Sequence, residues 1–228
     1  MATMRQPTRN PDPSSPRFFR RRLAPVALGV LASLVCASTA TAAGTKTIVF
    51  FGDSLTAGYG LDDPGAEAFP AVIQAKIDQA GLPWRVVNAG LSGETSAAGL
   101  RRVDWILRQP ADVFVLELGG NDGLRGIPPE STTANLQAII ERVRAKYPAA
   151  RIVLAGIAAP PNMGEDFTRT FDAIFPALAQ KNHLPLIPFL LEGVAAHPAL
   201  NQADGIHPNA KGHAAVAETV WGVLKSVL

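Results

Sequence analysis

Five short apolar runs, separated by stretches with helical spacing, constrain the fold of this chain more than any other feature. The runs lie at residues 47–51, 84–88, 113–118, 151–155 and 184–189. Between and after them, apolar residues recur every three or four positions in the stretches 68–80, 96–107, 131–146, 166–181 and 210–227. Short apolar strands that alternate with helices are typical of a parallel sheet covered on both faces. We therefore expect one α/β domain built on a five-stranded parallel sheet.

Single residues refine two of the expected helices. Ser131 or Thr132 is suited to cap the N-terminus of the helix at 131–146, because a side-chain oxygen there can accept from a free backbone N–H. Pro176 lies inside the stretch 166–181, where its ring should kink the helix.

Residues 1–42 differ in composition from the rest of the chain. Residues 1–22 are rich in Pro and Arg, residues 23–35 are apolar, and small residues follow as far as Ala43. This order is typical of a secretory signal peptide, with Ala40-Thr41-Ala42 as the best cleavage motif. An apolar stretch of 13 residues is shorter than the ~20 that a bilayer span needs, which disfavours a membrane anchor. We expect a leader at 1–42, cleavage near Ala42, and a periplasmic or secreted domain at 43–228.

Two other export signals fit the leader less well. Arg20-Arg21-Arg22 hints at twin-arginine export, but the surrounding residues fit that signal poorly. Cys36 could accept a lipid, but Val35 before it is larger than the residue that usually stands there.

The leader also accounts for the basic charge of the chain. The formal net charge of the full chain is +2, but residues 1–42 hold six arginines and one aspartate. The remainder has 15 Lys and Arg against 18 Asp and Glu, a net charge of −3. With no long basic run left, we expect no nucleic-acid partner. The single cysteine excludes a disulfide framework, and 47% hydrophobic residues exclude a disordered chain.

Polar segments follow the strands at the edge where parallel sheets usually carry their sites. They cover residues 52–60, 88–95 and 119–122, and a further polar segment lies at 204–209. Because the carboxyl ends of parallel strands meet at one edge, we expect these segments to lie together.

The residue types in these segments suit acyl transfer. A serine such as Ser54 is a weak nucleophile until a histidine removes its proton, and His207 lies three residues after Asp204, which could orient it. The reaction also needs donors for the oxyanion that develops on the substrate. The N–H groups of Ser54 and Gly93 and the side-chain amide of Asn121 are candidates on separate loops.

At this point the sequence resembles a known family. The runs Gly-Asp-Ser-Leu at 52–55, Ala-Gly-Leu-Ser-Gly-Glu-Thr at 89–95, Gly-Gly-Asn-Asp at 119–122 and Asp-Gly-Ile-His-Pro-Asn at 204–209 resemble the sequence blocks of the SGNH or GDSL hydrolases, in order. The longer runs at 119–126 and 204–209 are similar to the small bacterial periplasmic branch of thioesterases, lysophospholipases and arylesterases.

The resemblance implies a flavodoxin-like three-layer α/β/α sandwich for residues 43–228. It implies Ser54 as nucleophile, His207 as general base and acid, Asp204 as its orienting carboxylate, and Ser54, Gly93 and Asn121 as the oxyanion hole. The implied reaction cleaves an acyl or aryl ester or thioester through an acyl-enzyme and needs no metal or organic cofactor. A carbohydrate O-acetyl esterase and a catalytically silent binding module are the alternatives.

Three apolar stretches near these blocks, at 124–129, 157–161 and 188–191, could line a groove for a fatty acyl or aryl group. The substrate-binding residues expected from them are Leu124, Ile127, Ile157, Pro160 and Phe189. We expect a small-molecule acyl ester or thioester as substrate, a monomer, and no stable membrane insertion.

The remaining polar and aromatic residues favour structural roles. Asp53 and Glu117 are expected to be hydrogen-bonded structural carboxylates, and His213 is expected on a helix surface. The four histidines lack the companion spacing of a metal site. Three tryptophans, Trp84, Trp105 and Trp221, are expected in the core or half-buried.

Overall fold

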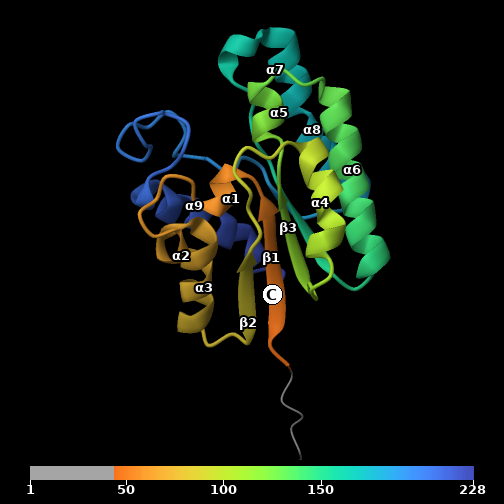
Figure 1. The fold of residues 1–228 in the computed structure, drawn as a ribbon, viewed down its shortest axis with the longest axis vertical. Coiled ribbons are helices and arrows are strands. Elements are labelled where there is room, and N and C mark those ends of the chain that lie inside the picture. Colours follow the sequence, from red (N-terminus) through yellow and green to blue (C-terminus); the bar gives the residue numbers. More distant parts are fainter. Residues whose placement is uncertain (1–43) are drawn as a thin grey trace, which may run out of the picture. The chain divides into compact units, whose positions relative to one another are not determined.

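The computed structural model describes residues 44–228, which form an open parallel β-sheet (Figure 1). The strand order is β2-β1-β3-β4-β5, and every neighbouring pair is parallel. The strands are β1 (Lys46–Gly52), β2 (Trp84–Asn88), β3 (Val113–Glu117), β4 (Arg151–Ala155) and β5 (Leu186–Ile187). The expected five-stranded parallel sheet is confirmed. The leader expected at 1–42 lies outside the described residues.

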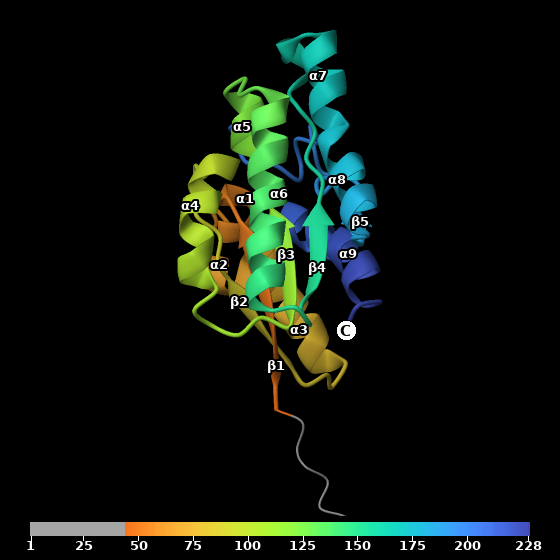
Figure 2. The same cartoon turned by 90° about the vertical axis from the view of Figure 1, so that its right-hand side faces the viewer.

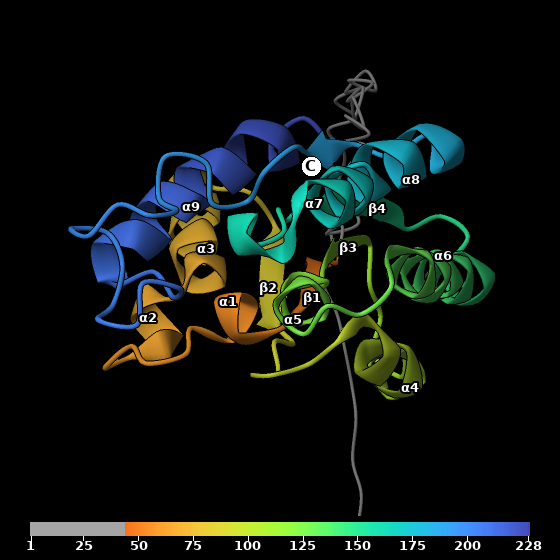
Figure 3. The same cartoon turned by 90° about the horizontal axis from the view of Figure 1, so that it is seen from above.

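Helices cover both faces of the sheet, as Figures 2 and 3 show from the side and from above. On one face α3 (Phe69–Gln79) packs against α9 (Ala210–Leu224). On the other, α6 (Pro129–Lys146) packs against α4 (Ser96–Ile106) and α8 (Ile174–Asn182). This arrangement is the expected three-layer α/β/α sandwich. None of the helices in residues 44–228 is long and apolar enough to span a bilayer.

Burial on both faces explains why the central strands are almost wholly apolar. Ile48 to Phe51 in β1 and Val113 to Leu116 in β3 are at most 2% exposed. Strands with two covered faces cannot alternate polar and apolar residues without burying the polar ones. Glu117 at the end of β3 is the exception, because it is a carboxyl group with no exposed surface.

Short helices occur mainly in the loops at the carboxyl edge of the sheet. They are α1 (Ser54–Ala57), α2 (Pro64–Glu67), α5 (Gly120–Leu124), the 3₁₀ turn η1 (Pro161–Met163) and α7 (Glu165–Asp172). Figure 1 shows α1 and α5 directly above the ends of β1 and β3. The periodicity of the sequence did not predict α2, α5 or η1, since one turn of helix is too short to show a period.

Proline residues explain three departures from the expected elements. The helix expected at 166–181 is two helices, α7 and α8, that meet at Ala173, because Pro176 cannot donate to a carbonyl one turn earlier. The strand expected at 184–189 pairs only at two residues between Pro185 and Pro188. Helix α6 starts at Pro129 instead of after Ser131, and its preceding residue makes no side-chain cap.

Two side chains lie where the sequence did not place them. His213 was expected on a helix surface but is 1% exposed, and its Nδ1 accepts the backbone N–H of Phe69 at 3.2 Å. It shares the inward stripe of α9 with Val216 and Val220, three and seven residues later, a spacing that could have revealed it. Trp105 was expected in or near the core but is 66% exposed on α4. Trp84 is buried, as expected.

Candidate active site

Ser54 lies at the start of α1, directly after β1. The side chain of Asp53 caps this short helix by accepting the backbone N–H of Leu55 at 3.0 Å. Gly58 ends it in the left-handed conformation, with φ of 77°, and donates its N–H to the carbonyl of Ser54. A strand followed at once by one capped turn of helix holds Ser54 at the carboxyl edge of the sheet.

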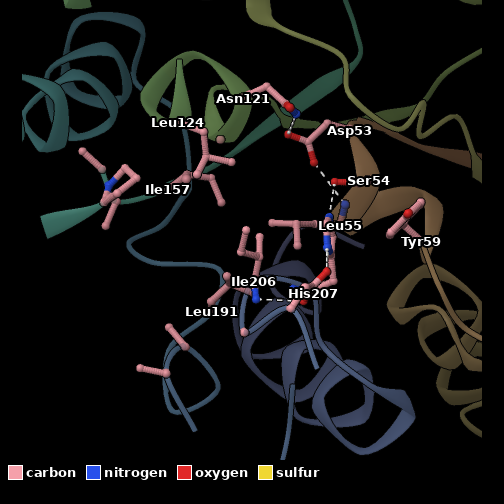
Figure 4. A pocket seen from close by; sticks show the side chains of 18 of the residues that line it. Asp53, Ser54, Leu55, Tyr59, Asn121, Leu124, Ile157, Leu191, Ile206 and His207 are labelled. Carbon is pink, nitrogen blue, oxygen red and sulfur yellow. Dashed lines mark hydrogen bonds and ion pairs between the residues drawn. The ribbon is translucent and has the colours of Figure 1, made fainter. Parts of the chain in front are cut away.

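His207 and Asp204 complete a chain of hydrogen bonds with Ser54. Figure 4 shows the side chains of Ser54 and His207 facing each other. The Nε2 atom of His207 lies 2.9 Å from Oγ of Ser54, and its Nδ1 atom lies 2.6 Å from Oδ2 of Asp204. The other carboxylate oxygen of Asp204 accepts the backbone N–H groups of Ile206 and His207 at 2.9 and 3.0 Å. Desolvation opposes ionisation of Asp204, but these hydrogen bonds outweigh it and lower its pKa to about 2.

The loop that carries Asp204 and His207 is held at its base. Asn201 and Pro208 form an isolated antiparallel bridge, and the side chain of Gln202 donates to the carbonyls of Pro208 and Tyr59 at 2.9 and 2.7 Å. The ring of Tyr59 lies against the imidazole of His207, with 4.8 Å between the ring centroids. Sequence reasoning missed Tyr59, because its contact with His207 joins segments almost 150 residues apart.

The three candidate oxyanion donors line one cavity with the serine. Ser54, Gly93 and Asn121 all border it. The amide nitrogen of Asn121 donates one hydrogen to Oδ2 of Asp53 at 3.1 Å, which leaves its second hydrogen for a substrate oxygen. The guanidinium of Arg125 donates to the carbonyl of Gly93 at 3.0 Å and to Oδ1 of Asn121 at 3.4 Å. Each end of the Asn121 amide is therefore held by a different residue.

The cavity beside Ser54 has a volume of about 600 Å³ and is lined mainly by apolar side chains. Leu124, Ile157, Pro160 and Phe189, expected at the groove, line it, and so does Leu191 at the end of the expected stretch 188–191. Ile206 also lines it and was not expected. Ile127 does not line it. The turn through Gly126 returns the chain to α5, where the N–H of Ile127 donates to the carbonyl of Asp122.

Two buried carboxyl groups lie beneath the loop that carries Ser54. Oε2 of Glu117 accepts the hydroxyl of Thr56 at 2.7 Å and the backbone N–H of Asp53 at 3.2 Å. Burial raises the pKa of Glu117 well above its usual range, and the nearby Asp53 raises it further. Burial also raises the pKa of Asp53, to about 6, against the lowering effect of bonds from Leu55 and Asn121. Both acids are hydrogen-bonded, as expected for structural carboxylates.

A third buried carboxyl group fixes the loop that carries Asn121. Asp122 accepts the backbone N–H of Ser96 at 2.8 Å and the hydroxyl of Thr132 at 3.1 Å, so it ties α5 to the starts of α4 and α6. Sequence reasoning considered Thr132 only as a helix cap.

Across residues 44–228, His, Cys, Asp and Glu side chains nowhere gather in threes as metal ligands would.

Residues 50–215 match the model of the GDSL-like Lipase/Acylhydrolase family, and this span holds every block described above. The chain belongs to this family. The match covers the end of β1, strands β2 to β5, the loop that carries Ser54 and the loop that carries His207.

Individual members of the GDSL-like family are similar over most of the chain. The Esterase TesA of Pseudomonas aeruginosa is 40% identical over 188 residues, which are 82% of this chain and 91% of that protein. The Thioesterase 1/protease 1/lysophospholipase L1 of Escherichia coli K12 is 40% identical over 181 residues, or 79% and 84% of the two chains. A crystal structure of TesA superposes with a TM-score of 0.76 at 39% identity and covers 80% of this chain and all of that one.

Proposed function

We propose that this protein hydrolyses carboxylic esters or thioesters, with Ser54 as nucleophile, His207 as general base and acid, and Asp204 as its orienting carboxylate. One observation carries the proposal. Oγ of Ser54, the imidazole of His207 and the carboxylate of Asp204 form a continuous hydrogen-bonded chain that opens into an apolar cavity. Membership of an acylhydrolase family supports the same reaction.

The geometry supports attack by Ser54 in the first half of the reaction. Nε2 of His207 removes the proton from Oγ of Ser54 as Oγ bonds to the carbonyl carbon of the substrate. The carbonyl oxygen becomes an oxyanion, which the N–H groups of Ser54 and Gly93 and the free amide hydrogen of Asn121 stabilise. His207 then returns its proton to the leaving alcohol or thiol, and an acyl group stays on Ser54.

Water completes the cycle in the second half. His207 removes a proton from water, the resulting hydroxide attacks the acyl carbon, and the oxygen of Ser54 leaves with the proton. Asp204 stays ionised throughout, since its pKa of about 2 is far below neutral pH, and it stabilises the imidazolium in both halves.

The lining of the cavity favours an acyl or aryl group as the part of the substrate that enters it. Leu124, Ile157, Phe189 and Leu191 offer no hydrogen-bonding side chain to a sugar. The similar proteins are named esterase and thioesterase/lysophospholipase, in keeping with an apolar acyl group.

We also propose that the protein is exported and cleaved near Ala42, which N-terminal sequencing of the extracytoplasmic protein would test. We propose that the enzyme is a monomer.

Replacement of the serine tests the assignment. Ser54→Ala should reduce kcat on a chromogenic butyryl ester by at least about 1,000-fold, because no other group can form the acyl-enzyme. Ser226→Ala, an exposed serine near the C-terminus, is the matched control and should retain full activity. Purified Ser54→Ala that hydrolyses the ester at the wild-type rate would show that the nucleophile lies elsewhere.

A further inference from the structure

Glu117 occupies a position in the sheet that the proposed reaction does not use. It ends β3 and pairs in register with Gly52, two residues before Ser54. Its side chain has no exposed surface, so it cannot contact substrate or solvent. A carboxyl group at the centre of a parallel sheet is costly to bury, which calls for an explanation in terms of what it contacts.

The contacts of Glu117 lie on both sides of the nucleophile. Oε2 accepts the backbone N–H of Asp53, the residue before Ser54, and the hydroxyl of Thr56, two residues after it. Gly52 provides the space, since a Cβ at that position would lie 2.3 Å from the same oxygen. The side chain of Glu117, from β3, thus holds in place the loop after β1 that carries the nucleophile.

Asp53 connects Glu117 to the proposed oxyanion hole. Asp53, whose N–H donates to Glu117, uses its own carboxylate to accept the amide of Asn121 at 3.1 Å and the N–H of Leu55 at 3.0 Å. A shift of Asp53 would therefore move the serine and the side-chain oxyanion donor together. Glu117 is the deepest member of this series of contacts.

The surroundings of Glu117 favour its neutral form. Oε1 has no hydrogen-bond partner in the described part of the chain, and no salt bridge there includes Glu117. A charge left on such an atom would be unpaired in the core. Asp53 keeps two donors on its carboxylate, and its proximity raises the pKa of Glu117 further. When two acids are this close, the one in the less favourable surroundings for a charge takes the proton. Asp53 has a donor on each carboxylate oxygen, whereas Glu117 has no exposed surface and one oxygen without a partner, so the proton belongs on Glu117.

We propose that Glu117, as a neutral carboxylic acid, is a positioning residue that holds Ser54 and Asn121 in the geometry for attack. The proposal rests on the proposed function, because it assigns Glu117 a role only if Ser54 is the nucleophile. Glu117 acts through Asp53 and Thr56 and does not contact the reacting atoms.

Three substitutions separate this role from a general contribution to folding. Glu117→Gln keeps the shape, the neutral charge and an accepting oxygen. Glu117→Leu removes both oxygens, and Thr56→Val removes the hydroxyl that donates to them. Glu141→Gln makes the same chemical change on the solvent-exposed side of α6 and is the matched control. Circular dichroism and thermal melting establish which variants fold.

The measurements are kcat and KM on a butyryl ester and the rate at which a fluorophosphonate acylates Ser54. We expect Glu117→Leu to lose about 30- to 100-fold in kcat and in labelling rate with KM within about twofold, since small displacements of reacting groups cost this much. Thr56→Val should lose about 3- to 10-fold, equivalent to one hydrogen bond. Glu117→Gln should stay within about threefold of wild type, because it restores the accepting oxygen.

Each result decides the proposal. Folded Glu117→Leu with wild-type kcat and labelling rate overturns it. If Glu117→Leu does not fold, Thr56→Val at the wild-type rate overturns it instead. A Glu117→Gln enzyme as impaired as Glu117→Leu would show that the charged form is needed. Infrared difference spectra at neutral pH should show a protonated-carboxyl band in wild type that Glu117→Gln lacks, and its absence overturns the neutral form. A Ser54→Ala enzyme that remains active would instead overturn the proposed function. This outcome can be told apart from those that overturn the role of Glu117.

Discussion

At the scale of the residue, Arg125 is an exposed side chain that holds a proposed oxyanion donor in place. Its guanidinium donates to Oδ1 of Asn121 and to the carbonyl of Gly93, so it joins two of the loops proposed to form the oxyanion hole. The bond to Oδ1 fixes which end of the Asn121 amide faces the cavity. Both bonds come from Nη2, which carries two hydrogens and can donate to two different oxygens.

Loss of these two hydrogen bonds should slow the chemical step. Arg125→Ala is expected to reduce kcat on a butyryl ester by about 10-fold, the equivalent of one hydrogen bond from a charged donor. The KM should change little, because Arg125 does not line the cavity. Arg101→Ala, an exposed arginine on α4, is the control. An unchanged kcat in Arg125→Ala would show that Asp53 alone orients Asn121.

Residues with distinctive chemistry could be named from the sequence, and residues that act by contact could not. Ser54, Asp204 and His207 lie in short motifs whose chemistry is apparent before the fold is known, and the structure brings them within hydrogen-bonding distance. Tyr59 carries no local signal, because it contacts His207 from another loop. Arg125 lies in the run 119–126, four residues after Asn121, but the sequence does not show its bond to Gly93 on a different loop. Their roles, like those of the motif residues, stay predictions until variants are assayed.

At the scale of the element, α9 docks on α3 through a buried histidine. Nδ1 of His213 accepts the N–H of Phe69 at the start of α3, and the two rings stack. Burial, and to a lesser degree the positive charge of His207, lowers the pKa of His213 from 6.5 to about 4. Between about pH 4 and pH 6.5, His213 is therefore mostly neutral in the folded protein and mostly protonated in the unfolded chain.

This difference in the pKa of His213 predicts that acid weakens the contact between α3 and α9. As the pH falls from about 6.5 to about 4, the unfolded state binds a proton that the folded state excludes, so the free energy of unfolding should fall, by up to about 3 kcal/mol. Urea titrations at several pH values measure it. His213→Asn should show a smaller fall, since its amide does not titrate in this range.

The control for this experiment is an exposed histidine. His197→Asn should keep the full pH dependence of wild type, since His197 is solvent-exposed. Other groups, such as Asp53 with its raised pKa, contribute equally to all three proteins and cancel in the comparison. Parallel curves for wild type and His213→Asn would contradict the prediction.

The strands and long helices could be predicted because each has the length and burial that give a clear apolar pattern. Strands β2 and β4 begin and end where the sequence placed them, and the other long elements differ by a few residues. The pattern failed where backbone chemistry overrides it. Prolines divide the helix at 166–181 and shorten β5, and one-turn helices such as α1 depend on caps instead of periodicity.

At the scale of the whole molecule, the cavity joins loops from every part of the described domain. Its lining includes Leu55 after β1, Leu124 after β3, Ile157 after β4, Phe189 after β5 and Ile206 before α9. No single segment contains the proposed acyl site, so the sequence could only indicate apolar loops near the motifs as candidates. Ile127 shows the limit of that method, since it lies in a nominated loop but not at the cavity.

The size and lining of the cavity predict a dependence on acyl-chain length. Ile157→Glu places a charge in the apolar wall and should raise KM for octanoyl and longer esters by about 10-fold or more, since burying a charge beside an alkyl chain is costly. Acetyl esters, which do not reach the wall, should be hydrolysed nearly as before. Leu82→Glu, at an exposed leucine beyond α3, is the control. Equal losses on acetyl and octanoyl esters would argue against an acyl-binding role for this cavity.

The distance along the chain between the proposed nucleophile and its proposed base has a consequence for synthesis. Ser54 is set by the first strand, whereas His207 arrives 153 residues later on a loop just before the last helix. A nascent chain interrupted anywhere between them holds a serine with no group to take its proton. On the proposed mechanism, the chain is inactive until His207 has been made, and hydrolysis reports that the segments carrying Ser54 and His207 have come together.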